Sequence, residues 1–397
     1  MSSDVLVLEE KLVDAARAMI PFLRAQAGET ERSRKITATV ERAFRDAGFY
    51  RALQPQAYAG AQLAYGAHTR IAMELARGCP SSAWAYSVTA CHSWILGMFP
   101  RAAQDEFWAQ APESTIASTF LPAQAQLTRG AEAGVAGVRL SGRWRFSSNV
   151  DNCQGCIVLA VEPQESGPPK QFFALLARDQ YRIEETWDVV GLAGSGSNDV
   201  VVDSAFVPAH RLLDVMTTRM ANTPGAHASD SDLSHTPLFC AFAHSLVGVA
   251  VGGAQGALDV LLDELGEKTS VAQVRLAQQA NVQMRIAEAT AEIEAARALI
   301  AADRAKIVAG ARARVLPDDE QRVRYRLNTG YAAKLAVQAV ERLLPLLGGR
   351  GLERSHPFQR LWRDVHAVAQ HIALVWDVQA LNYGAVRLGF KAMDPRI

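Results

Sequence analysis

Two histidines lie in apolar stretches of the chain, where a titratable side chain is unexpected. His371 follows the segment RDVHAVAQ, and helical spacing places it on one face with aliphatic residues between positions 367 and 375. His92 lies in SSAWAYSVTACHSWILGMF, residues 81–99, which is apolar nearly all round, as in a buried helix. An imidazole in such a place is usually a core residue hydrogen-bonded to the backbone, but it can also serve as an acid or a base. The two histidines alone leave both interpretations open.

Two serines follow a tryptophan in the segment GRWRFSSN, residues 142–149. Ser147 and Ser148 could hydrogen-bond the polar edge of a flat cofactor, and the indole of Trp144 could cover its face. An ordinary strand that ends in a serine-rich turn explains the same residues.

A glycine-rich segment, GGRGL, joins two predicted helices near the C-terminus. One glycine would suffice to end the first helix. Gly348, Gly349 and Gly351 with an intervening arginine indicate either a close backbone approach to a ligand such as a phosphate or a plain turn between helices.

Other site signatures are weak or missing. The pair Cys153 and Cys156 lies in β-like sequence, without a second Cys or His pair at metal-binding spacing, so two buried thiols are expected rather than a zinc or redox site. The chain has no GxGxxG after a strand, no Walker A lysine motif, no HExxH and no GxSxG. A Rossmann domain, an α/β hydrolase and a metal site are therefore not predicted.

Composition bounds the class of protein. Of 397 residues, 49% are hydrophobic and 21% are charged, as in a soluble protein of two or three packed subdomains. Lys+Arg and Asp+Glu balance at 41 each, which argues against nucleic acid or an anionic membrane as a partner. No secretory signal is visible, and no uncharged apolar run reaches the roughly 20 residues of a membrane helix. Five cysteines, an odd number, suggest reduced thiols and a cytoplasmic location.

Four parts of the chain must position these residues. Residues 1–112 are predicted to be helical, and residues 113–216 form short β-like segments between Gly, Pro and Ser turns, as in an antiparallel β domain. Residues 217–236 are polar, and they are predicted to be a disordered linker or a lid over a pocket. Residues 237–397 return to the helical period in four long segments, which can close a four-helix bundle. The last of these helices is predicted to run unbroken from 355 to 389.

In this order, the segments resemble the acyl-CoA dehydrogenase superfamily over nearly the whole chain. The likeness includes GFYRALQPQAYAGAQ and MELARGCPSSAWAYSV near the N-terminus, STIASTFLP and GVRLSGRWRFSSN in the β region, and GGRGLERSHPFQRLWRD in the bundle. The resemblance implies a mostly α fold with an N-terminal helical domain, a central antiparallel β domain and a C-terminal four-helix bundle. It also implies a flavin between the last two domains and a homotetramer.

The carboxylate base of the dehydrogenases has no counterpart at either of its usual positions. The segment after the RD pair holds His371, and the first bundle helix, PLFCAFAHSLVGVAVGGAQGALD, contains no Glu. The chain resembles another branch of the superfamily in four features. These are a His at the C-terminal position, a His matching His92, a Ser matching Ser118, and a strand that ends at Asn149 where that branch has a Gly. That branch comprises the oxygenase components of two-component flavin-dependent monooxygenases related to 4-hydroxyphenylacetate 3-hydroxylase.

This resemblance implies that reduced FMN or FAD reacts with O2 to a flavin C4a-hydroperoxide, which hydroxylates an aromatic substrate. A separate NAD(P)H-dependent reductase would supply the reduced flavin. His371 would assist oxygen activation, Ser148 or Ser147 would contact flavin N5, and His92 with Ser118 would hydrogen-bond the substrate. The expected catalytic residues are His371, Ser148 and His92, and the expected cofactor contacts are Trp144, Ser147, Ser148, Gly348, Gly349, Arg363 and His371.

The charge state of His371 follows from its expected surroundings. Asp364 lies on the same predicted helix face, and it is expected to pair with Arg360 or Arg363. Burial without a carboxylate partner lowers the pKa of an imidazole, so a largely neutral His371 is predicted.

The first bundle helix also bears on the substrate. Residues 237–258 contain no Lys or Arg, and they offer Phe239, Phe242 and His244 as contacts. A buried carboxylate without a cation would be costly, so a neutral phenol, indole or fused ring is expected. Two alternatives stay open: a dehydrogenase of an acyl thioester whose base lies elsewhere, and a non-catalytic helical binding protein of the same fold.

Overall fold

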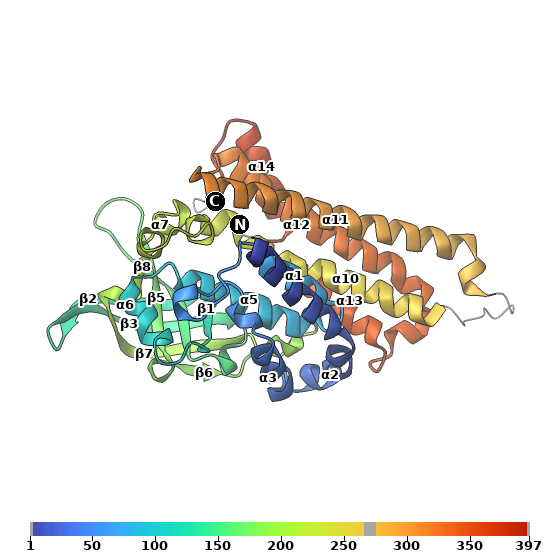
Figure 1. The fold of residues 1–397 in the computed structure, drawn as a ribbon, viewed down its shortest axis with the longest axis horizontal. Helices are drawn as coiled ribbons and strands as arrows, with labels where there is room; N and C mark the ends of the chain where they lie inside the picture. The colour runs from blue at the N-terminus through green and yellow to red at the C-terminus, as the bar shows by residue number, and fades with distance from the viewer. Residues whose placement is uncertain (1–2, 266–274, 395–397) are drawn as a thin grey trace.

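The computed structural model describes residues 3–265 and 275–394 as N-terminal helices, a β domain and a C-terminal helical bundle (Figure 1). This is the fold class that the sequence predicts. The N-terminal helices are α1 (Ser3–Ala18), α2 (Ile20–Arg32), α3 (Ala38–Asp46), α4 (Ala67–Ala76), α5 (Pro80–Leu96) and α6 (Arg101–Trp108).

Two boundaries among these helices differ from the sequence prediction. The amphipathic segment 7–27, expected to be helical throughout, breaks at Met19, and Pro21 lies in the first turn of α2, where proline is tolerated. The helix predicted from residue 31 begins instead at Ala38. The hydroxyl of Thr37 accepts a hydrogen bond from the backbone N–H of Val40 at 3.3 Å and caps this helix.

Two four-stranded sheets, with orders β1-β4-β5-β8 and β2-β3-β7-β6, form the β domain and enclose a shared core. The sequence predicts antiparallel pairing throughout, but β1 and β4 run parallel because the β2–β3 hairpin of the other sheet connects them. The strands are β1 (Ile116–Thr119), β2 (Pro122–Glu132), β3 (Val135–Ser147), β4 (Gly155–Glu162), β5 (Lys170–Ala177), β6 (Arg182–Glu184), β7 (Asn198–Pro208) and β8 (Leu212–Asp214).

Helix α10 is the central helix of the C-terminal bundle and packs against α4, α5, α12 and α13. The expectation that no apolar run is long enough for a membrane helix is wrong, because residues 238–265 could cross a membrane by length and composition. However, 83% of the most apolar window is buried inside the protein, as in a core helix. The helices of this part are α9 (Leu238–Ala241), α10 (Ala243–Leu265), α11 (Ala280–Ala313), α12 (Asp319–Leu343), α13 (Pro357–Ala369) and α14 (Trp376–Arg387).

The unbroken helix predicted through His371 is wrong. Helix α13 ends at Ala369 and α14 begins at Trp376. Between them the carbonyl of His371 accepts hydrogen bonds from the backbone N–H groups of Leu374 at 2.7 Å and Val375 at 3.0 Å, which closes a tight turn. His371 is therefore a turn residue rather than a member of a helix face.

The polar segment 217–236 has defined structure, which contradicts a disordered linker. It contains the end of α7 (Val215–Arg219), then α8 (Pro224–His227) and a short 3₁₀ turn, η7 (Leu233–His235). The indole of Trp94 on α5 donates to the Leu233 carbonyl at 3.1 Å, and the backbone N–H of Gly225 donates to the Met98 carbonyl at 3.0 Å. A Cβ at Gly225 would lie 1.9 Å from the Gly97 carbonyl oxygen, so the close contact requires glycine.

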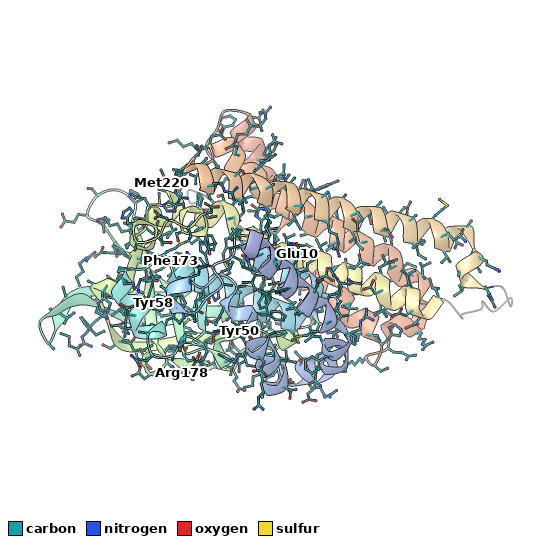
Figure 2. All side chains as sticks on the ribbon, in the orientation of Figure 1. Glu10, Tyr50, Tyr58, Phe173, Arg178 and Met220 are labelled. Carbon is teal, nitrogen blue, oxygen red and sulfur yellow. The ribbon has the colours of Figure 1, made fainter. Side chains whose placement is uncertain are left out.

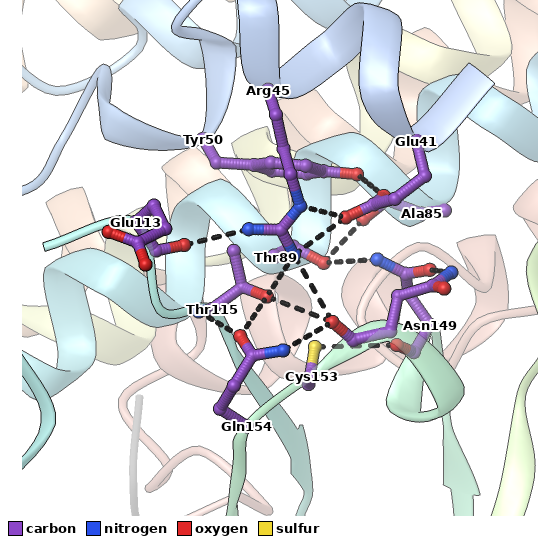
Figure 3. A network of polar contacts seen from close by, with 11 residues as sticks. Glu41, Arg45, Tyr50, Ala85, Thr89, Glu113, Thr115, Asn149, Cys153 and Gln154 are labelled. Carbon is purple, nitrogen blue, oxygen red and sulfur yellow. Dashed lines mark hydrogen bonds and ion pairs between the residues drawn. The ribbon is translucent and has the colours of Figure 1, made fainter. Parts of the chain in front are cut away.

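A network around Arg45 fastens α3 to the β domain (Figure 3). The Arg45 guanidinium binds Glu41 at 2.8 Å, the Glu113 carbonyl at 2.8 Å, and the Thr115 hydroxyl at 3.2 Å. Burial raises the pKa of Glu41, although the Tyr50 hydroxyl, which donates to it at 2.5 Å, and Arg45 both favour its charged form.

Replacing Arg45 by Met should lower the free energy of unfolding by about 2–3 kcal/mol, because a buried carboxylate loses its cation. The loss should be larger at pH 8 than at pH 5. The folded-state pKa of Glu41 would rise further above its unfolded value, so stability would fall as the pH increases through it. Urea denaturation at both pH values measures this. Arg42→Met, which removes an exposed charge from the same helix, is the control. Equal losses at the two pH values would contradict the account.

Candidate active site

The end of β3 is irregular, and this turns Phe146 outward while Trp144 stays inside. Residues i and i+2 of a regular strand share a face, but Phe146 has a φ of 65°, and the register with β7 shifts between Trp144 and Ser147. Phe146 is 43% exposed, whereas Trp144 is fully buried and donates its indole N–H to the Leu159 carbonyl at 2.8 Å. The prediction that Trp144 covers a cofactor is therefore wrong, because its ring belongs to the core between the sheets.

The two serines after this irregularity have different surroundings. Ser147 is fully buried in the β domain and donates to the Ser118 carbonyl at 3.3 Å. Ser148 instead accepts a hydrogen bond from the indole N–H of Trp84 on α5 at 2.9 Å and shares a 2.7 Å hydrogen bond with Ser197. Of the two predicted contacts, Ser148 is the one at the border between the β domain and the helices.

Trp84 also brings His371 to this border, since the two rings lie 5.8 Å apart. Nδ1 of His371 accepts a hydrogen bond from the backbone N–H of Ala373 at 3.1 Å, which places the proton of the neutral ring on Nε2. Desolvation, with a smaller contribution from the Arg326 guanidinium, lowers the pKa of His371 to about 4. The imidazole is neutral, in line with the sequence expectation, and Nε2 is the nitrogen that can donate.

Asp364 on α13 connects this border to the β domain. Its buried carboxylate accepts hydrogen bonds from the backbone N–H of Leu192 at 2.7 Å and from the hydroxyl of Ser81 at 3.1 Å. Desolvation raises the pKa of Asp364 to about 6, although both hydrogen bonds favour the charged form. The carboxylate thereby joins three segments: α13, α5 and the loop before β7.

The predicted pairing of Asp364 with Arg360 or Arg363 is wrong. Both guanidinium groups bind Glu31 on α2, Arg360 at 2.7 Å and Arg363 at 2.5 Å. Arg363 also donates to the Val190 carbonyl. The Arg363 guanidinium already pairs with Glu31 and the Val190 carbonyl, so the geometry does not support the predicted contact of Arg363 with a cofactor.

His92 and Ser118 hydrogen-bond each other, whereas the sequence expectation is that each contacts the substrate. His92 Nδ1 lies 3.0 Å from the Ile116 carbonyl, which can only accept, so Nδ1 carries the proton. His92 Nε2 then accepts from the Ser118 hydroxyl at 2.7 Å. Desolvation lowers the pKa of His92 to about 4, which keeps the ring neutral. The hydroxyl oxygen of Ser118 is left to accept a hydrogen bond from another group.

Aromatic rings gather next to this pair, where the β domain meets the helices. The ring of Phe173 on β5, which is labelled in Figure 2, lies 4.7 Å from that of Phe120, two residues beyond Ser118. The Phe120 ring also lies 5.9 Å from that of Phe242. Phe173 in turn lies 6.3 Å from Phe239 on α9. Two of the predicted substrate contacts, Phe239 and Phe242, therefore belong to one aromatic cluster.

Three other predicted site residues lie elsewhere. His244 is on the side of α10 that faces α11, with its Nε2 3.4 Å from Asp303, and it does not join the aromatic cluster. Gly348 and Gly349 are exposed, and a Cβ at either position would meet no atom within 4 Å. Gly348 has a φ of 60°, which accounts for one glycine; a cofactor contact there stays a prediction.

A hollow of about 300 Å³ opens beside Phe146. The Trp187 ring packs edge-on against Phe146 at 6.0 Å, and the Arg145 guanidinium stacks on Phe146 at 4.5 Å. Within residues 3–265 and 275–394, Arg145 makes no ion pair. Phe146 lies two residues before Ser148 and holds an exposed ring at a strained φ. Together with the Trp187 indole and the Arg145 cation, this ring fits a flat ring system with a phosphate tail, such as a flavin. The hollow is lined by Arg143, Arg145, Phe146, Thr186, Trp187 and Asp199.

Sequence reasoning missed Trp84, Phe146, Trp187 and Ser197. Trp84 stands in the quoted SSAWAYSV segment, and its place on the face of a buried helix opposite Ser148 follows only from the packing of α5 against the β domain. Phe146 stands two residues from Trp144, and strand alternation assigns both rings to one face. The positive φ of Phe146 cannot be predicted from the amino-acid sequence.

Two family models match the chain. The acyl-CoA dehydrogenase N-terminal domain covers residues 9–111, and the acyl-CoA dehydrogenase C-terminal domain covers residues 244–376.

Curated relatives and solved structures match over almost the full length. The chain is 33% identical to an FADH(2)-dependent resorcinol hydroxylase, oxygenase component, of Rhizobium sp. (strain MTP-10005), with 96% of this chain and 95% of the relative covered. It is 31% identical to the flavin-dependent monooxygenase oxygenase subunit HsaA of Rhodococcus jostii (strain RHA1), covering 96% and 99%. The structure of XiaF from Streptomyces sp. in complex with FADH2 and glycerol superimposes with a TM-score of 0.91 at 25% identity, covering 100% and 99%. The chain therefore belongs to the acyl-CoA dehydrogenase superfamily and, within it, to the oxygenase components of flavin-dependent monooxygenases, which use reduced flavin and O2 to hydroxylate small aromatic compounds.

Proposed function

We propose that the substrate is a small neutral aromatic compound with a ring O–H or N–H group, a phenol in the first instance. The Ser118–His92–Ile116 chain carries this proposal. Because the Ile116 carbonyl fixes the proton on His92 Nδ1, the Ser118 proton points to His92, and the free lone pairs of Ser118 accept from a donor on the substrate. The cluster around Phe120 supplies apolar walls for a flat ring.

The same chain gives the substrate hydroxyl a place for its proton. A phenol that donates to Ser118 can pass its proton through the serine hydroxyl to His92 Nε2 as the ring becomes electron-rich. His92 is neutral near pH 7, since desolvation lowers its pKa to about 4. It is a weak base that takes up a proton only transiently, which suits a step in which the proton returns.

On the cofactor side, reduced flavin supplies the electrons that activate O2 and allow one oxygen atom to enter the ring. Ser148, held by Trp84 and Ser197, presents a hydroxyl to the cofactor edge. His371 holds a proton on Nε2 and can deliver it to oxygen. The buried helix α5 and the aromatic cluster exclude water, which favours transfer to the substrate over release of peroxide.

The positions of Lys and Arg residues near the aromatic cluster support a neutral substrate. Helices α9 and α10 carry no Lys or Arg before Leu258. Arg326 reaches the cluster from α12, but it donates to the Phe239 carbonyl at 3.3 Å and to the side-chain amide oxygen of Gln379 at 3.2 Å. These bonds hold the guanidinium within the helical bundle, so a substrate carboxylate gains no dedicated partner.

Membership of the oxygenase components implies a separate flavin reductase. We include in the proposal that this reductase uses NAD(P)H, that either FMN or FAD serves, and that the protein is a cytoplasmic homotetramer. The hollow beside Phe146 supports use of both flavins, because Arg145 can pair with the phosphate that FMN and FAD share.

Replacing Ser118 by Ala should weaken binding of a phenol such as resorcinol about tenfold, the cost of one hydrogen bond. The dimethyl ether of resorcinol has no O–H group to donate, so it should bind equally to both proteins. Equilibrium dissociation constants for the two ligands measure the difference. Ser93→Ala, a buried serine on α5 that contacts the Tyr50 carbonyl instead, is the control. A phenol affinity that is unchanged in Ser118→Ala would contradict the proposed substrate contact.

Replacing His371 by Asn should leave reduced flavin bound but lower the product formed per flavin consumed, with the balance released as hydrogen peroxide. Positioned proton transfer contributes roughly 10²–10⁴-fold, so the rate of hydroxylation should fall by at least about a hundredfold. His366→Asn, a half-buried histidine of α13 bound to Glu341, should behave as wild type. Unchanged rate and coupling in His371→Asn would make His371 a turn residue only.

A further inference from the structure

A second hollow, of about 460 Å³, lies between α4, α10 and α11, and its lining includes neither Ser148 nor His371. Met73, Ile300 and Val308, with several alanines, form an apolar floor. The lining includes four arginines and no Asp or Glu, and these arginines are Arg70, Arg297, Arg304 and Arg312.

Three of the four arginines are neutralised by carboxylates outside the lining. The buried Glu9 binds both Arg70 and Arg304 at 2.7 Å. Asp232 binds Arg312 at 3.2 Å. These ion pairs hold the three guanidinium groups in place and leave little net charge around them.

Arg297 differs from the other three. Within the described ranges 3–265 and 275–394 it makes no ion pair and no hydrogen bond, and its Nε is buried without a partner. His244 also lines the hollow and is 2% exposed. Its Nδ1 lies 3.2 Å from the Ala241 carbonyl, so in the neutral ring Nε2 is an acceptor, and within the described part of the chain it has no hydrogen-bond partner. The nearest carboxylate to His244, that of Asp303, is occupied by two hydrogen bonds from Asn328, at 2.9 and 3.0 Å. Among the described residues, Arg297 is therefore the cation of the hollow whose donors are unused.

We propose that this hollow binds a small organic carboxylate, with its acid group on Arg297 and its apolar body on the floor formed by Met73, Ile300 and Val308. A guanidinium pairs with a planar carboxylate through two parallel hydrogen bonds, which an isolated Arg297 can offer and the three paired arginines cannot. The volume of about 460 Å³ lies in the range of small-molecule sites. The site is separate from hydroxylation and holds whether or not the proposed substrate is correct.

A carboxylate side chain from a second copy of the protein could also reach Arg297. The recessed apolar floor favours a free ligand, because a protruding Asp or Glu side chain would leave that floor uncovered. The two occupants differ in a measurable way: only the free ligand binds without a change in the mass of the assembly.

Isothermal titration of the full-length protein with sodium benzoate, sodium hexanoate and inorganic phosphate tests the proposal. The organic acids should bind one per chain and more tightly than phosphate, which cannot use the apolar floor. Arg297→Met should raise the benzoate dissociation constant at least about tenfold. Arg297→Lys keeps the positive charge but loses the two parallel N–H donors of the guanidinium, so its effect should be smaller. Lys306→Met removes an exposed charge from α11 outside the lining and should change nothing.

Equal benzoate affinity in Arg297→Met and wild type would overturn the proposal, as would phosphate binding as tightly as benzoate. Analytical ultracentrifugation covers the remaining case. If Arg297→Met lowers the mass of the assembly and the wild-type protein binds neither organic acid, Arg297 serves a contact between copies, and the proposal is wrong.

Discussion

A single buried carboxylate, that of Asp364, holds together three segments next to the proposed cofactor contacts Ser148 and His371: α13, α5 and the loop before β7. It binds the loop before β7 through Leu192 and α5 through Ser81, while its own helix leads directly to the turn of His371. Gly191 lies so close to α13 that a Cβ would approach the Arg363 carbonyl oxygen to 2.4 Å. Desolvation raises the pKa of Asp364 to about 6, so ionisation costs stability as the pH rises through that value. The two donated hydrogen bonds offset this cost, and breaking either would leave a buried charge poorly satisfied.

Burial sets the protonation state of the two histidines of the proposed site, His92 and His371. His92 and His371 both have a pKa lowered to about 4, and in both rings one backbone group selects the nitrogen that carries the proton. His92 is arranged to accept at Nε2 and His371 to donate from Nε2. The same fold thus supplies a weak base beside the aromatic cluster and a proton donor near Trp84. Neutral rings also leave the proposed site apolar, which suits a reaction that water would divert to peroxide.

The sequence predicts the order of domains, the buried helix of His92 and the strand that carries Ser148, because these depend on periodicity and composition. The family resemblance singles out His92 and Ser118, but the hydrogen bond between them is found only in the structure. Three features could not be predicted, since each depends on a local backbone choice or on tertiary contacts. The turn at His371 interrupts an apolar period that continues on both sides of it. The positive φ of Phe146 turns its ring away from the face that strand alternation would have it share with Trp144. Arg363 binds Glu31, a residue more than 300 positions away, and this contact removes it from the predicted cofactor set.

The most direct test of the account is the fate of oxygen in a single turnover. The protein, reduced FAD and resorcinol are mixed with ¹⁸O₂ in unlabelled water, and the product is analysed by mass spectrometry. A monooxygenase places one oxygen atom of O2 in the new hydroxyl group and the other in water. The account predicts one ¹⁸O atom per molecule of hydroxylated product and less than one peroxide for each flavin oxidised. Product with unlabelled oxygen, or flavin oxidation that yields only peroxide with resorcinol and with other neutral phenols, would contradict it.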